Sequence, residues 1–126
     1  MRIGVAQLNS TVGDLQGNLA LALDAYEQLV GQGSELVVFP ELFISGYPPR
    51  DLLIKEKFLQ DSLEVLHDFA RQTGPTPALI GFPESSPKHP SKTFNSAAWC
   101  EHSKVDQVFR KRLLPTYDVF DESRYF

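Results

Sequence analysis

The chain has 126 residues, of which 42% are hydrophobic and 22% charged, and its formal net charge is −4. This balance predicts one soluble globular domain and argues against a nucleic-acid-binding surface. No stretch approaches the roughly 18 apolar residues of a membrane span, and no apolar signal-peptide core follows Met1. The single cysteine, Cys100, cannot form an intrachain disulfide, which fits a reducing cytoplasmic location.

The first part of the chain predicts a β-α-β unit. Residues 2–7 have the pattern of a strand, and residues 18–30 carry apolar side chains at helical spacing, with Asn18 as the expected N-cap. The short, β-branched run at residues 36–39 then predicts a strand buried on both faces. Pro40 ends this strand because proline has no N–H to give to a ladder.

The second part predicts one more helix, one more buried strand and a hairpin. Apolar residues recur with helical spacing over 58–70, and residues 78–82 form an apolar run that Pro83 closes. Residues 95–101 and 104–110 flank a His102-Ser103 turn, which predicts a β-hairpin. Helix-linked strands followed by a hairpin favour a layered α/β fold.

Two glutamates follow Phe-Pro pairs near the ends of predicted strands: Glu41 and Glu84. Open α/β folds place their chemistry at the carboxyl edge of the sheet, and the apolar neighbours of Glu41 would desolvate its carboxylate, as suits a general base. We expect both strands to deliver their glutamates to the same edge, so Glu84 competes with Glu41 for this role. The alternative for Glu41 is a solvated loop carboxylate or a helix N-cap.

Three blocks of the sequence resemble a known family. They are residues 6–18 (Ala-Gln-Leu-Asn-Ser-Thr-Val-Gly-Asp-Leu-x-Gly-Asn), residues 39–53 (Phe-Pro-Glu-Leu-Phe-Ile-Ser-Gly-Tyr-Pro-Pro-Arg-Asp-Leu-Leu) and residues 110–126 (Arg-Lys-Arg-Leu-Leu-Pro-Thr-Tyr-Asp-Val-Phe-Asp-Glu-Ser-Arg-Tyr-Phe). These blocks resemble the nitrilase (carbon–nitrogen hydrolase) superfamily and, more narrowly, the N-terminal glutaminase domains of glutamine-dependent NAD synthetases. The resemblance implies that residues 1–126 form the N-terminal part of an α-β-β-α sandwich.

The resemblance also assigns roles to single residues, because the family uses a Glu, a Lys and a Cys in catalysis. By motif position Glu41 corresponds to the general base and Lys111 to the lysine. Glu122 resembles a second glutamate that braces the lysine, and Tyr117 resembles a tyrosine that lines the glutamine pocket. Cys100 does not correspond to the nucleophile, since the family's cysteine follows the lysine, and a place in the hairpin predicts a packed thiol.

We therefore expect that the C-terminal part of the domain, with the nucleophilic cysteine, is absent and that the chain alone is inactive. In the whole enzyme the resemblance implies hydrolysis of glutamine to glutamate. The ammonia would pass to a C-terminal NAD synthetase domain, which uses ATP and Mg²⁺ to amidate nicotinic acid adenine dinucleotide, in a homo-oligomer. Two alternatives stay open. One is a catalytically silent module that binds a partner, and the other is part of a different nitrilase-type small-amide amidase.

No cofactor or metal is expected within these 126 residues. The sequence has no Gly-rich phosphate-binding loop. The three histidines, at positions 67, 89 and 102, lack the spacing of metal ligands relative to one another and to Cys100.

Overall fold

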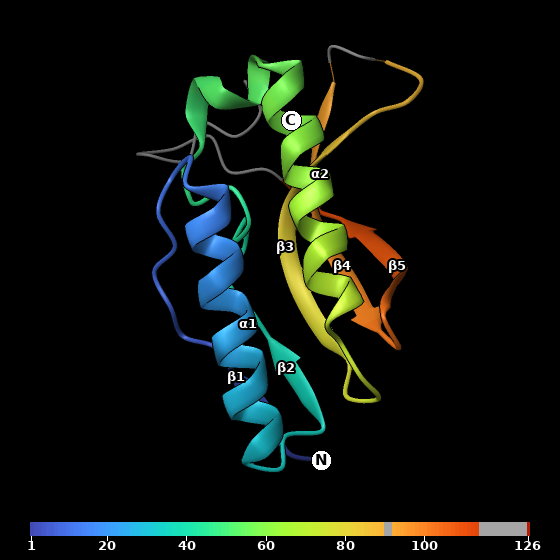
Figure 1. Cartoon of the computed structure of the whole chain (residues 1–126). Helices are drawn as coiled ribbons and strands as arrows, with labels where there is room; N and C mark the ends of the chain where they lie inside the picture. The colour runs from blue at the N-terminus through green and yellow to red at the C-terminus, as the bar shows by residue number, and fades with distance from the viewer. Residues whose placement is uncertain (90–91, 114–125) are drawn as a thin grey trace.

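The computed structural model describes residues 1–89, 92–113 and 126, and Figure 1 shows their arrangement. The helices and strands in chain order are β1 (Ile3–Val5), α1 (Leu15–Gly31), β2 (Leu36–Val38), the 3-10 helix η1 (Arg50–Ile54), α2 (Glu56–Arg71), β3 (Ala78–Ser85), β4 (Thr93–Glu101) and β5 (Lys104–Arg110). Tyr117 and Glu122 lie outside the described residues, so their expected roles stay predictions.

The described strands form one five-stranded sheet in the order β1-β2-β3-β4-β5. Neighbours are parallel from β1 to β3 and antiparallel from β3 to β5. The parallel part contains the predicted β-α-β unit, with α1 between β1 and β2, and the antiparallel part contains the predicted hairpin. This topology confirms the expected layered α/β fold.

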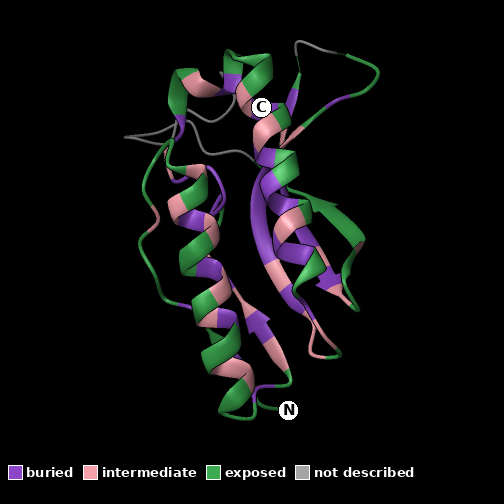
Figure 2. Ribbon diagram, in the orientation of Figure 1, coloured by how far each residue is buried: buried purple, intermediate pink, exposed green. Residues whose placement is uncertain are grey.

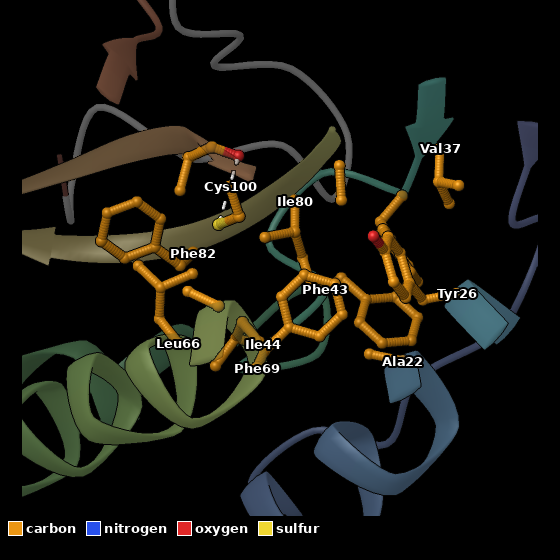
Figure 3. Packing of buried hydrophobic residues seen from close by; sticks show 14 of the residues in the cluster. Ala22, Tyr26, Val37, Phe43, Ile44, Leu66, Phe69, Ile80, Phe82 and Cys100 are labelled. Carbon is orange, nitrogen blue, oxygen red and sulfur yellow. Dashed lines mark hydrogen bonds between the residues drawn. The ribbon is translucent and has the colours of Figure 1, made fainter. Parts of the chain in front are cut away.

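Both helices bury their apolar sides against one face of the sheet. Tyr26 of α1 and Phe69 of α2 meet edge to face, with ring centroids 6.0 Å apart, in the core that also contains Ile80 of β3 (Figure 3). Figure 2 shows that most of β3 is buried. The opposite face of the sheet is less covered by the described residues, since Val5 and Phe109 are 64% and 50% exposed. The described part is thus one helix layer and one sheet layer.

Helix α1 begins one turn earlier than predicted, and Asn18 is not its N-cap. The cap is Asp14, whose Oδ1 accepts a hydrogen bond of 3.0 Å from the Gly17 amide. Asn18 is fully buried instead, and its side-chain amide bonds both backbone groups of Thr11 and the carbonyl of Ile44. Asn18 therefore joins the loop before α1 to the segment after β2.

Strand β3 runs through Pro83 to Ser85, so the prediction that Pro83 ends this strand is wrong. Pro83 is opposite Asn95 of β4. The backbone carbonyl of Asn95 faces away from β3, because it accepts a hydrogen bond from the Lys111 amide that follows β5. The Pro83 nitrogen therefore points away from β4, towards the side where β2 pairs β3 only as far as Leu79. Proline is tolerated there because no ladder hydrogen bond is lost.

The other boundaries differ from the expected ones by a few residues. Helix α2 is longer than the predicted 58–70, and β1 is shorter than the predicted 2–7. Within the described ranges, neither long helix has the length and apolar character needed to cross a membrane.

Candidate active site

Glu41 and Lys111 form an ion pair, although 70 residues separate them in the sequence. The Lys111 Nζ lies 2.6 Å from the Glu41 Oε1, and the two side chains are 31% and 44% exposed, respectively. Asn95 donates a hydrogen bond of 2.5 Å from its Nδ2 to the same Glu41 oxygen. The structure thus brings together the two residues predicted to be catalytic and adds an amide that sequence reasoning did not single out.

The backbone around Glu41 lies directly against β3. Leu42 has a φ of 51°, in the left-handed region that non-glycine residues rarely adopt, and the Ile44 amide donates a hydrogen bond of 3.1 Å to the Gly81 carbonyl. A Cβ on Gly81 would stand 2.8 Å from the Pro40 carbonyl oxygen. Glycine at position 81 and the turn at Leu42 therefore fix the position of the Glu41 backbone, from which its side chain extends.

The apolar neighbours of Glu41 do not surround its carboxylate as we expected. Phe39, Leu42 and Phe43 are at most 6% exposed because they point into the core. Glu41 itself lies at an open pocket of about 360 Å³, to which Leu79, Ala97 and Phe109 contribute apolar surface. The pocket is apolar over most of its lining and carries its charged groups together, a distribution that is common in sites for small molecules.

A β-bulge in β5 directs the Lys111 side chain to this pocket. Cys100 is opposite Val105, but Trp99 is opposite Gln107, so Asp106 has no partner on β4. Side chains alternate between the two faces of a sheet, and one extra residue moves all later side chains to the other face. Val105 packs against the helix-side core, and without the bulge Lys111 would share that face.

Glu84 and Glu41 both lie near the carboxyl ends of parallel strands, as expected, but Glu84 does not compete with Glu41 for the active site because its side chain lies on the other face of the sheet. Glu84 lies within β3, on the same face as Phe82, which belongs to the helix-side core. Its two carboxylate oxygens each accept a hydrogen bond of 2.9 Å from Arg110, and Ser96 donates another of 2.8 Å. The bond from Arg110 is the main cause of the lowered pKa of Glu84. Glu84 is therefore one half of a structural ion pair.

Cys100 has the properties of a packed side chain, as the hairpin position predicted. The thiol is fully buried in the core shown in Figure 3, where its Sγ lies 4.0 Å from the Ala98 carbonyl oxygen. Burial raises the pKa of Cys100 to about 12. A thiol with so little thiolate near neutral pH is a poor nucleophile. Among the residues that the structure describes, no cluster of histidine, cysteine and carboxylate side chains could hold a metal ion.

Asn95 is the site residue that sequence reasoning missed. It is 4% exposed and lies in β4, and its carbonyl accepts the backbone hydrogen bond of Lys111 at 2.8 Å. An asparagine among apolar strand residues is a signal that could have found it, because a buried amide requires partners.

The described residues thus form a layered α/β fold with a Glu–Lys pair at an open pocket. The family model of the carbon–nitrogen hydrolases matches residues 2–126, and the chain belongs to this family. Over 129 residues it is 43% identical to the glutamine-dependent NAD(+) synthetase of Thermotoga maritima, a match that covers 100% of this chain and 22% of that synthetase. The chain thus spans about 22% of the length of this relative.

Solved structures agree with this assignment. A glutamine-dependent NAD(+) synthetase from Cytophaga hutchinsonii superposes with a TM-score of 0.92 at 28% identity, over 100% of this chain and 21% of the synthetase. A variant of the amidase from Nesterenkonia sp. AN1, with the acetamide moiety of fluoroacetamide added covalently at its active-site cysteine, superposes with a TM-score of 0.79 at 27% identity, over 100% and 47% of the two chains. The expected nitrilase-type α/β fold is confirmed.

Proposed function

We propose that the chain supplies the base and the lysine of a glutamine amidohydrolase, namely the N-terminal part of the glutaminase domain of a glutamine-dependent NAD synthetase. The observation that carries this proposal is the ion pair of Glu41 and Lys111 beside an apolar pocket. The 43% identity to a glutamine-dependent NAD(+) synthetase supports the choice of glutamine.

The chemistry requires a thiol that the proposal places outside residues 1–126. Glu41 takes the proton of that thiol, and the thiolate attacks the side-chain amide carbon of glutamine. Lys111 stabilises the negative charge that develops on the amide oxygen. The carbon–nitrogen bond breaks, ammonia leaves with the proton, and a water molecule that Glu41 activates cleaves the thioester to give glutamate and the free thiol.

The remaining parts of the proposal concern the whole enzyme. Ammonia passes to a C-terminal synthetase domain, which uses ATP to amidate nicotinic acid adenine dinucleotide, and the enzyme acts as a cytoplasmic homo-oligomer. Glu122 would brace Lys111, and Tyr117 would contact glutamine. The covalent adduct at the active-site cysteine of the Nesterenkonia amidase supports a thiol mechanism in this family.

A different small-amide amidase is the second candidate, because the Nesterenkonia amidase has a similar fold. The synthetase is favoured by both measures of similarity. The TM-score is 0.92 for the Cytophaga synthetase and 0.79 for the amidase variant. The identity is 43% to the Thermotoga synthetase and 27% to the amidase variant.

A grafted enzyme tests the proposal. Residues 1–126 would replace the matching segment of the Thermotoga maritima synthetase, and ammonia release from glutamine and from acetamide would be measured. We expect the graft to hydrolyse glutamine in preference to acetamide, and the 126-residue chain alone to hydrolyse neither. NAD formation from added ammonia shows that the graft is folded. A graft that makes NAD from ammonia but releases none from glutamine would overturn the proposal, as would glutaminase activity of the chain alone that Cys100→Ala abolishes.

A further inference from the structure

We propose that Asn95 is a positioning residue that fixes the Glu41 carboxylate, so that Oε2 rather than Oε1 is the oxygen that takes the proton. The inference rests on the proposed function, because it assigns the base within that mechanism. It concerns Asn95 of β4, whose side chain bonds Glu41 and whose backbone carbonyl bonds the Lys111 amide.

The two oxygens of Glu41 have different environments. Oε1 accepts hydrogen bonds from Asn95 Nδ2 at 2.5 Å and from Lys111 Nζ at 2.6 Å. Within the described part of the chain, no hydrogen bond reaches Oε2. Donors lower the basicity of the oxygen that accepts them, so Oε2 is the more basic oxygen and the one with room for a proton.

Asn95 is well placed to hold this geometry because it is itself held firmly. The residue is 4% exposed and lies in β4, between β3 and β5. Its carbonyl accepts the Lys111 amide at 2.8 Å, while its side chain reaches Glu41. One residue therefore sets the position of the base and the starting point of the lysine side chain at the same time.

The amide chemistry of Asn95 also suits this role. A side-chain amide donates a hydrogen bond without adding charge, so it orients the carboxylate while Lys111 remains its ion-pair partner. An aspartate at the same position would place a second carboxylate against Glu41, and the two would repel each other. An alanine would leave Lys111 alone to orient a half-exposed carboxylate.

Ser96 provides a matched control from the next position of the same strand. Its hydroxyl also donates to a glutamate from a buried position, but the acceptor is Glu84, on the opposite face of the sheet. Ser96→Ala thus removes a comparable hydrogen bond that involves neither Glu41 nor Lys111.

The kinetic test uses Asn95→Ala, Asn95→Asp and Ser96→Ala in the grafted synthetase. We expect Asn95→Ala to lower kcat for glutamine roughly 10- to 100-fold with KM almost unchanged, since misplacing a catalytic group by about 1 Å has effects of this size. Asn95→Asp should lower kcat further, and Ser96→Ala should leave both constants unchanged. An increase in KM at normal kcat would show a substrate contact instead, and normal kinetics in Asn95→Ala would show no role; either result overturns the proposal.

A second measurement on the 126-residue chain separates this proposal from the proposed function. Urea unfolding midpoints would be compared for Asn95→Ala, Glu41→Gln and the double variant, and for Ser96→Ala combined with Glu41→Gln. We expect the effects of Asn95→Ala and Glu41→Gln on the free energy of unfolding to be non-additive. The effects of Ser96→Ala and Glu41→Gln should be additive. Additivity in both cycles would overturn the Asn95–Glu41 coupling even if the graft is active. An inactive wild-type graft with non-additive midpoints would contradict only the glutaminase assignment.

Discussion

Gly81 of β3 lies so close to the backbone of Glu41 that no residue larger than glycine fits at position 81. A Cβ built on Gly81 would stand 2.9 Å from the carbonyl carbon of Glu41 and 2.8 Å from the Pro40 carbonyl oxygen. These atoms belong to the backbone, which cannot turn aside as a side chain can. The position of the proposed base therefore depends on the absence of a side chain on the neighbouring strand.

Gly81→Ala should destabilise the chain and displace Glu41. Overpacking of this kind costs about 1–3 kcal/mol, which a urea-unfolding experiment resolves. Gly74→Ala is the matched control, because a Cβ at Gly74 would meet nothing within 4 Å. If the two alanine variants unfold at the same urea concentration, the backbone contact is not as close as described.

Cys100 should react with iodoacetamide only after the chain unfolds. The thiol is buried and its pKa is raised to about 12, so almost no thiolate is present at pH 8. Mass spectrometry should find the native chain unlabelled over minutes and the chain in 8 M urea fully labelled. Rapid labelling of the native chain would contradict the packed position and reopen a nucleophilic role for this cysteine.

The ion pair of Glu84 and Arg110 should make the chain's stability depend on pH on the acid side. The hydrogen bond from Arg110 is the main cause that lowers the pKa of Glu84 from its ordinary value of 4.5. A carboxylate with a lowered folded pKa contributes stability above pH 4.5, and this contribution is lost as the pH falls below that value. Glu84→Gln should therefore make the free energy of unfolding less dependent on pH between about pH 5 and pH 3.

Arg110→Met provides the check on that prediction, because it removes the partner and leaves the carboxylate. The free energy of unfolding of Arg110→Met should depend on pH as weakly as that of Glu84→Gln. The double variant should show the same pH dependence as Glu84→Gln alone. Full additivity of the two substitutions would show that the pair does not act as one unit.

Lys111→Met in the grafted synthetase should lower kcat for glutamine by about 10²- to 10³-fold, the range for loss of one group that stabilises an oxyanion. Lys104→Met is the control, since Lys104 is an exposed lysine at the opposite end of β5. NAD formation from added ammonia should be unaffected in both variants. Equal glutaminase rates in the two variants would remove Lys111 from the mechanism.

Much of the fold could be predicted because apolar periodicity and turn residues determine it locally. The two long helices, the β-α-β unit and the hairpin all follow from such patterns. Their boundaries were less accurate for identifiable reasons. Asp14 and Asn18 are both good capping residues, and Asn18 instead bonds Thr11 and Ile44, a long-range contact that no local pattern contains.

The site was predictable only where a motif carried it. Glu41 and Lys111 were found because each lies in a recognisable block, whereas Asn95 belongs to none. Counting residues from the His102-Ser103 turn would place Lys111 on the helix side, and only the bulge at Asp106 reverses that placement. Glu84 was misassigned because the local Phe-Pro-Glu pattern does not reveal that β3 continues past Pro83.

The most direct test of the account is the rate of glutamine hydrolysis by the grafted synthetase with Glu41→Gln. This substitution keeps the shape of the side chain and removes its ability to take a proton, so we expect kcat to fall by about 10²- to 10⁴-fold. NAD formation from added ammonia should stay normal. A Glu41→Gln graft that hydrolyses glutamine at a near-normal rate would contradict the assignment of Glu41 as the general base.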